Sequence, residues 1–235
     1  MEYFAHGKIG FLIFKWIHFL AGITWIGVLY YFNFIQGEWF KEIENQTKGT
    51  AVRTLVPRAL WWFRWGAMFT FLSGVIMLGL HGHSSLVFGA NSYTLNIYVG
   101  SLLGILMFLN VWLVIWPAQK VVIASSESVA NGGEAHPEAA YCLSSAGLAS
   151  RTNTLFSIPM LFFMAAARGL NLPISTNPAT ASISTAMIVA SVTILLLQAN
   201  ALYGKTGPMT SVKGVIHCGV ALTLVLYLCV IYLVA

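Results

Sequence analysis

Long apolar stretches that contain no carboxylate constrain the fold of this chain more than any other feature. Polar residues, glycine and proline divide the sequence into six such stretches, at about 10–34, 59–80, 95–118, 143–168, 182–203 and 213–234. Each has roughly the 20 residues that a helix needs to cross the hydrocarbon core of a bilayer. The sequence therefore predicts an all-α integral membrane bundle of about six transmembrane helices, in a single domain over residues 1–235.

The composition excludes the main alternatives to a membrane protein. Only 8% of the residues are charged, against about 25% in soluble globular domains. The hydrophobic fraction of 58% also excludes intrinsic disorder, which requires low hydrophobicity and high charge. Because the few basic residues lie at the ends of the apolar stretches, the sequence pI of about 9.2 does not indicate binding to nucleic acid.

The distribution of lysine and arginine predicts the orientation of the chain. The connections after the first, third and fifth spans hold most of them: Lys41, Lys48, Arg53, Arg58, Lys120, Arg151, Lys205 and Lys213. The other side has Lys8 and Arg168, with Lys15 just inside the first span. By the positive-inside rule, both termini are expected on the non-cytoplasmic side. The first apolar run is longer than that of a signal peptide, so we expect this helix to be retained.

Two of the segments between the spans allow further structural predictions. Trp39, Phe40 and Ile43 lie at helical spacing between the first two spans, which predicts a short interfacial helix. Residues 124–141 are rich in Ser, Gly, Ala and Glu and predict an exposed loop.

Histidine is the main candidate for chemistry inside the membrane. All seven carboxylates lie outside the spans, which disfavours carboxylate proton relays and paired acid–base hydrolysis there. His18 and His217 lie within the first and sixth spans, and His81 and His83 lie at the end of the second. A neutral imidazole in a helix bundle is the usual axial ligand of haem b, which makes these four residues the candidate cofactor ligands.

Small residues one helical turn from two of these histidines provide room for a flat cofactor. His18 has Ala21 and Gly22 on its face, and His217 has Gly214 and Ala221. The same small residues also line ordinary contacts between transmembrane helices, where a histidine only forms a hydrogen bond. Both interpretations stay open.

Depth limits which histidines can share one haem. At 1.5 Å per residue, His18 lies roughly 12 Å from the outer end of its span and His217 roughly 6 Å from the inner end of its own. These depths leave the two about 12 Å apart along a ~30 Å core. This favours a pairing of His18 with His81 or His83, in which case His217 serves a second site or none. The His-Gly-His sequence could instead hold copper or zinc.

Each of the other polar residues in or near the spans has two possible roles. Arg64 and Arg151, near the predicted cytoplasmic ends, either bind haem propionates or extend to the interface. Asn110, Asn153 and Gln198 either bind a polar ligand or connect helices by hydrogen bonds, and we expect the second. The cysteines Cys142, Cys218 and Cys229 form no CxxCH motif, so we expect no c-type haem.

Four segments resemble a known family. They are 25–36 (WIGVLYYFNFIQ), 60–67 (LWWFRWGA), 110–120 (NVWLVIWPAQK) and 150–160 (SRTNTLFSIPM). Together they resemble the membrane domain of the bacterial cytochrome c-linked urate oxidase family, over roughly residues 15–165. The resemblance implies an integral oxidoreductase of the bacterial inner membrane that passes electrons to a cytochrome c.

The chain also departs from the family's pattern. The family joins this membrane domain to a c-type cytochrome domain, whereas the present sequence contains no CxxCH, and its membrane domain is shorter. After the run Phe162-Phe163-Met164 the resemblance implies a histidine, where this chain has Ala165. If that histidine binds metal in the family, one site is lost here.

The sequence thus leads to two hypotheses. The first is a redox component of an oxidoreductase that binds haem b and exchanges electrons with a separate cytochrome c or partner subunit. The second is a cofactor-free accessory subunit of a larger membrane complex, which has kept the fold of the family without its chemistry.

Overall fold

The computed structural model describes residues 8–81, 91–170, 172, 174 and 183–234, except for the side chains of Lys8 and His81. All regular structure in these residues is helical. The first half contains α1 (Lys8–Tyr30), η1 (Tyr31–Gln36), α2 (Gly37–Glu42), α3 (Asn45–Thr54) and α4 (Val56–His81). The second half contains α6 (Ser92–Leu109), η2 (Asn110–Ile115), α7 (Trp116–Ala130), α8 (Ala139–Gly169), α9 (Ile183–Tyr203), η3 (Gly207–Thr210) and α10 (Val212–Val234). The predicted all-α membrane bundle is confirmed.

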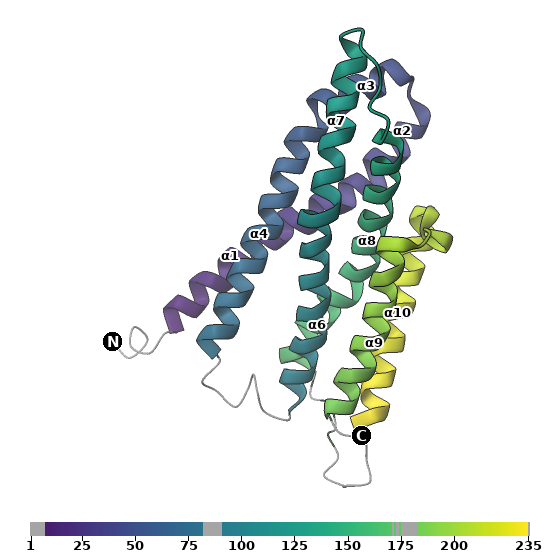
Figure 1. Cartoon of the computed structure of the whole chain (residues 1–235). Coiled ribbons are helices and arrows are strands. Elements are labelled where there is room, and N and C mark those ends of the chain that lie inside the picture. The colour runs from purple at the N-terminus through teal and green to yellow at the C-terminus, as the bar shows by residue number, and fades with distance from the viewer. Residues whose placement is uncertain (1–7, 82–90, 171, 173, 175–182, 235) are drawn as a thin grey trace.

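The helices run alternately up and down the bundle (Figure 1). α1 begins and α10 ends at the same end of the molecule, here called the lower end. At the upper end, α3, α7 and the first turns of α8 extend well beyond the turn between α9 and α10. α1 packs mainly on α4, whereas α10 packs on α8 and α9.

Five helical segments are long and apolar enough to cross a membrane: Ile9–Glu42, Val56–Leu80, Ser92–Ala130, Ile183–Tyr203 and Val212–Val234. These correspond to five of the six predicted spans. The remaining prediction, 143–168, falls on α8, which is a long helix but a more polar one. α8 packs against α6, α7, α9 and α10, so much of its surface faces other helices and does not need lipid-compatible side chains.

Buried amides join α8 to its neighbours. Asn110 Nδ2 donates to Asn153 Oδ1 at 2.9 Å and to Gln198 Oε1 at 3.0 Å. Gln198 Nε2 donates back to Asn110 Oδ1 at 2.6 Å, and Asn153 Nδ2 donates to the Met107 carbonyl at 3.0 Å. All three amides are at most 9% exposed. The expectation that these residues connect helices is confirmed.

The polar connections are more helical than their composition indicates. Trp39 and Phe40 of the predicted interfacial helix lie in α2, which continues the first span without a break, and Ile43 follows its end; the interfacial location stays a prediction. The predicted loop at 124–141 is wrong at both ends, because α7 continues to Ala130 and α8 begins at Ala139. The last turns of α7 are polar, and packing against α3 stabilises them. The helix ends at Ala130, and Gly132 follows in the turn with a φ of +81°, which favours a residue without a side chain.

Two of the long helices widen into one π-helical turn. These turns are η1 and η2, and each buries side-chain amides: Asn33 and Gln36 in η1, and Asn110 in η2. η2 ends two residues before Pro117, which cannot donate a backbone hydrogen bond. Segments of this kind often lie at functional sites.

Replacing Asn110 by leucine should destabilise the bundle. The change leaves the buried amides of Asn153 and Gln198 without a shared partner, and we expect the free energy of unfolding to fall by about 1–3 kcal/mol. Unfolding in mixed detergent, followed by circular dichroism, measures it. The control is Leu113→Ala in the same π turn, where the side chain is 68% exposed and the expected change is below about 0.5 kcal/mol. Equal losses in both variants would contradict a structural role for the network.

Candidate functional site

His18 is held by a hydrogen bond between two helices. Its Nδ1 lies 2.9 Å from the backbone carbonyl oxygen of Thr70 on α4 and 3.2 Å from Ser73 Oγ. Because a carbonyl oxygen only accepts, this contact places the ring proton on Nδ1. The lone pair of Nε2 is then available to a ligand, which is the arrangement that proteins use to orient metal-binding histidines.

A pocket of about 650 Å³ lies beside His18, here called the His18 pocket. Its walls come from α1, α4, α6 and α8 and are mostly apolar. Small and flexible side chains contribute to them: Gly22, Gly27, Met77, Met160, Met164 and Ala165. Gly22 is one of the two small residues that the sequence placed beside His18. A pocket of this size falls within the about 300–1,000 Å³ that is usual for cofactor sites.

Two cationic residues also line the His18 pocket. Lys15 lies one turn before His18 on α1, and Arg168 lies in the last turn of α8. The Arg168 guanidinium carbon is 5.6 Å from the centre of the Tyr93 ring, which lines the same pocket. α1 begins and α8 ends at the lower end of the bundle (Figure 1), so the two cations mark that end of the pocket.

The other predicted histidines do not join His18 in the described structure. His217 is exposed on α10, a helix that contributes no residue to the His18 pocket. His81 ends α4, where the backbone alone is described, and His83 lies outside the described residues. The predicted pairing of His18 with His81 or His83, and the alternative copper or zinc site, therefore stay predictions. No group of three metal-binding side chains occurs among the residues that are described.

The two predicted arginines also lie elsewhere. The Arg64 guanidinium carbon lies 3.8 Å from the centre of the Trp116 ring on α7, a close cation–π contact. Arg151 Nη2 lies 3.8 Å from Glu38 Oε1, and Arg151 lines a second cavity at the upper end. Neither arginine lines the His18 pocket, where Lys15 and Arg168 are the cationic residues instead.

The second cavity has a volume of about 1,120 Å³ and is here called the upper cavity. Residues from η1, α2, α3, α4, α7 and α8 line it, among them Asn33, Gln36, Lys48, Arg53, Gln119 and Arg151. Sequence reasoning did not anticipate it. Gln36 ends an apolar run and carries no periodic signal that would distinguish it from an ordinary helix end.

A comparison with known families gives one match, to the family described as Urate oxidase N-terminal, over residues 83–225. The match covers more than half of the chain. The chain belongs to this family. No curated protein and no solved structure matches it.

Only part of the His18 pocket lies within the residues that match the urate oxidase N-terminal family. Residues 83–225 span α6 to α9 and the first part of α10, and they include Tyr93, Met160 and Arg168 of the pocket wall. His18 itself, on α1, lies outside the match. The match reaches further toward the C-terminus than the resemblance seen in the sequence, and it omits the segments 25–36 and 60–67. Ala165, where the resemblance implied a histidine, lines the His18 pocket.

Replacing Gly74 by valine should displace the His18 ring. A Cβ atom at Gly74 would lie 3.3 Å from His18 Cε1 and 3.5 Å from Nδ1, so the larger side chain forces the ring away from the Thr70 carbonyl. We expect a loss of about 1–3 kcal/mol in the free energy of unfolding. Gly79→Val on the same helix is the matched control, because nothing lies within 4 Å of a Cβ there. Histidine nitrogen chemical shifts report the bond, and unchanged shifts in the Gly74 variant would contradict this confinement.

Proposed function

We propose that this chain is a membrane redox subunit that holds one haem b in the His18 pocket. It exchanges electrons with a separate cytochrome c or another subunit of a membrane complex, in the inner membrane of a bacterium. The observation that carries the proposal is the His18 imidazole, whose Nδ1 is bonded to the Thr70 carbonyl at 2.9 Å beside an apolar pocket.

The residues of the pocket fit such a cofactor in three respects. An imidazole nitrogen with a free lone pair is a normal axial ligand of haem iron. The apolar walls suit the macrocycle, and the volume of about 650 Å³ is within the usual range. Lys15 and Arg168 provide positive charge for the anionic propionates, which favour charge-assisted hydrogen bonds.

The second axial position has candidates that the sequence did not single out. Met77 on α4 and Met160 and Met164 on α8 line the same pocket. A thioether opposite an imidazole is the ligand pair of cytochromes c, and it raises the reduction potential. We propose a methionine as the second ligand, with His81 or His83, at the end of the second predicted span, as the alternative.

A bound haem b supplies one-electron transfer at iron, and the chain supplies position and environment. The Thr70 carbonyl orients the His18 ring and raises its basicity as a ligand. The apolar walls limit the access of water, which also tunes the potential. Lys15 and Arg168 would provide positive charge for its anionic propionates at the lower end of the bundle.

The location of the pocket determines where electrons leave. His18 lies ten residues after the start of α1, or about 15 Å along the helix. The orientation expected from the positive-inside rule puts this end on the non-cytoplasmic side. A cytochrome c partner would therefore dock at the lower end, close to the pocket.

The decisive experiment is an absorption spectrum of the purified protein. We expect a Soret band and a pyridine haemochrome of the b type. His18→Ala should remove both, because it deletes the axial ligand, whereas His217→Ala should keep them, because that side chain is exposed on α10. The iron, copper and zinc content of each sample is measured by elemental analysis.

Two results would overturn the haem proposal. If protein expressed with ample haem has no Soret band, the accessory-subunit hypothesis replaces it. If copper or zinc replaces iron and is lost in His81→Ala or His83→Ala, the metal site lies in the outer loop.

A histidine at position 165 should change the ligation of the haem. Ala165 lines the pocket that His18 borders, so Ala165→His introduces a second imidazole. We expect a low-spin bis-histidine spectrum and a lower reduction potential, because an imidazole replaces a thioether. Ala165→Leu is the control for added bulk. Identical spectra and potentials in the histidine and leucine variants would argue against haem at this position.

A further inference from the structure

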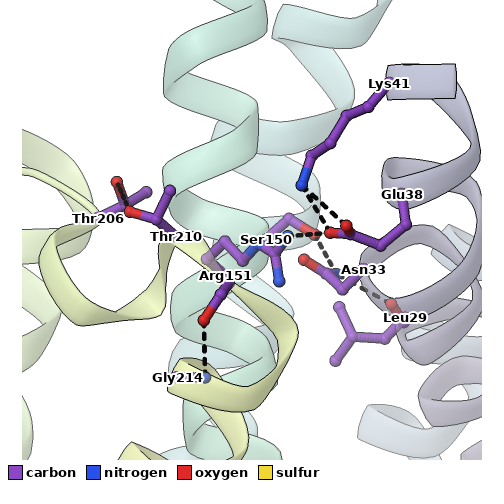
Figure 2. Close-up of polar contacts among 10 residues, drawn as sticks. Leu29, Asn33, Glu38, Lys41, Ser150, Arg151, Thr206, Thr210 and Gly214 are labelled. Atoms are coloured by element: carbon purple, nitrogen blue, oxygen red, sulfur yellow. Dashed lines mark hydrogen bonds and ion pairs between the residues drawn. The ribbon is translucent and has the colours of Figure 1, made fainter.

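Arg64 is a cation inside the membrane-spanning helix α4 and has no acidic partner among the described residues. Its guanidinium carbon lies 3.8 Å from the centre of the Trp116 ring, and its Nε is buried with no hydrogen-bond partner. Between the residues that the structure describes, ion pairs form only with Glu38. Figure 2 shows the contrast: Arg151 extends from α8 toward Glu38, whose Oε1 lies 3.8 Å from Arg151 Nη2.

A second cation borders the same tryptophan ring. Lys120 Nζ lies 5.7 Å from the centre of the Trp116 ring, and the Lys120 side chain is exposed. The first carboxylate after it on α7 is Glu127, seven residues later, or about 10 Å along the helix. Cations inside a membrane normally pair with another group. Because neither of these two pairs with a described carboxylate, an anionic partner has to come from outside the described chain.

Five tryptophans surround the two cations and are here called the indole patch: Trp61, Trp62 and Trp65 on α4, Trp112 on η2 and Trp116 on α7. The ring centres of Trp65 and Trp112 are 5.8 Å apart and join α4 to η2. Trp61 and Trp62 are 47% and 59% exposed. Exposed indoles are typical of the headgroup level of a bilayer, where the apolar ring meets lipid and the N–H group meets polar atoms.

The seam between α4 and the helix formed by η2 and α7 has donors that lack acceptors. Trp112 Nε1 is buried with no hydrogen-bond partner, as is Arg64 Nε. Buried donors are almost always paired, so two orphaned donors at one seam need an explanation. The cation–π contact with Trp116 provides Arg64 with no oxygen acceptor. A ligand that brings anionic oxygens to this seam would meet that need.

An apolar strip continues from the indole patch along α4. Phe69, Leu72 and Ile76 are 53%, 44% and 38% exposed, and with Trp65 they lie at the spacing of one helix face. The ring centres of Trp65 and Phe69 are 6.1 Å apart. The strip thus leads from the cations toward the lower end of the bundle, as an acyl chain below a headgroup would.

The depth and orientation of the patch also fit a lipid. α4 begins at the upper end of the bundle (Figure 1), and Arg64 follows Val56, its first residue, by eight positions, or about 12 Å. The positive-inside rule puts the upper end on the cytoplasmic side. The cytoplasmic leaflet contains anionic lipids, and basic pockets between helices on this side bind their headgroups.

From these observations we propose that the seam between α4 and α7 binds the headgroup of an anionic phospholipid of the cytoplasmic leaflet. The Arg64 guanidinium donates to the phosphate oxygens, and Lys120 adds a second positive charge beside Trp116. The acyl chains lie along the exposed face of α4 that begins at Trp65. Neither cation lines the His18 pocket or the upper cavity, so the site does not depend on haem.

Two brominated phospholipids with identical acyl chains test this site, because bromine quenches indole fluorescence on contact. One has a phosphatidylglycerol headgroup, which is anionic, and the other has phosphatidylcholine, in which choline neutralises the phosphate. Each is titrated into phosphatidylcholine nanodiscs that contain the protein, at about 0.15 M salt, where charges more than ~8 Å apart are largely screened. Phosphatidylglycerol should reach half-maximal quenching at about a tenfold lower fraction, the effect of one charge-assisted hydrogen bond.

Substitutions identify the contacts. Arg64→Gln should reduce the preference for phosphatidylglycerol about five- to tenfold, because it removes the charged donor. Arg58→Gln is the matched control: it removes the same charge from an exposed position on the same helix, and we expect a change below about twofold. Lys120→Gln should reduce the preference about two- to fivefold. Since Lys120 is exposed, this change provides the test if the Arg64 variant does not fold.

Three results would overturn the proposal. The first is the same quenching curve for the two brominated lipids in the parent protein. The second is an equal effect of Arg58→Gln and Arg64→Gln in variants whose unfolding midpoints match the parent. The third is reversal of the quenching by glycerol phosphate added to the solution, which would assign the seam to a soluble phosphate compound instead of a lipid.

Discussion

The polar interior of α8 is the feature around which the rest of the structure is arranged. A bilayer core has no water to satisfy polar groups, so each must find a partner within the protein. Asn153 bonds to Asn110 of η2, Ser150 to Asn33 of η1, and Ser157 to Tyr30 of α1 at 2.9 Å. These bonds place the first and third spans against one helix, and they explain why α8 has to lie inside the bundle.

The two cavities follow from this arrangement because both border α8. The His18 pocket lies against its last turns and is largely apolar, with one oriented imidazole. The upper cavity lies against its first turns and is rich in amides and cations. Their linings differ accordingly: the first is mostly apolar around one imidazole, and the second contains amides and cations. Since they lie at opposite ends of one helix, a change in either can be studied without directly altering the other.

Much of the fold and part of the site were predictable from local sequence. Helical ranges near 182–203 and 213–234 follow from hydropathy, because those helices have extensive exposed apolar faces. His18 was predictable as a polar residue in an otherwise apolar run. Its hydrogen bond to Thr70 was not, because it joins residues 52 positions apart. The helical end of α7 was mistaken for a loop, because its polar residues are supported by packing on α3 rather than by lipid.

The sequence by itself determined that the chain is a helical membrane protein, where most of its spans lie, and that carboxylates are excluded from them. These properties depend on the cost of placing charge and unpaired backbone in hydrocarbon, which is a property of each segment alone. The tertiary structure decided which polar side chains meet. It brought Lys15 and Arg168, rather than Arg64 and Arg151, to the His18 pocket, and it placed Arg151 beside Glu38 at a second cavity. Such pairings depend on the rotation and register of packed helices, which no single segment encodes.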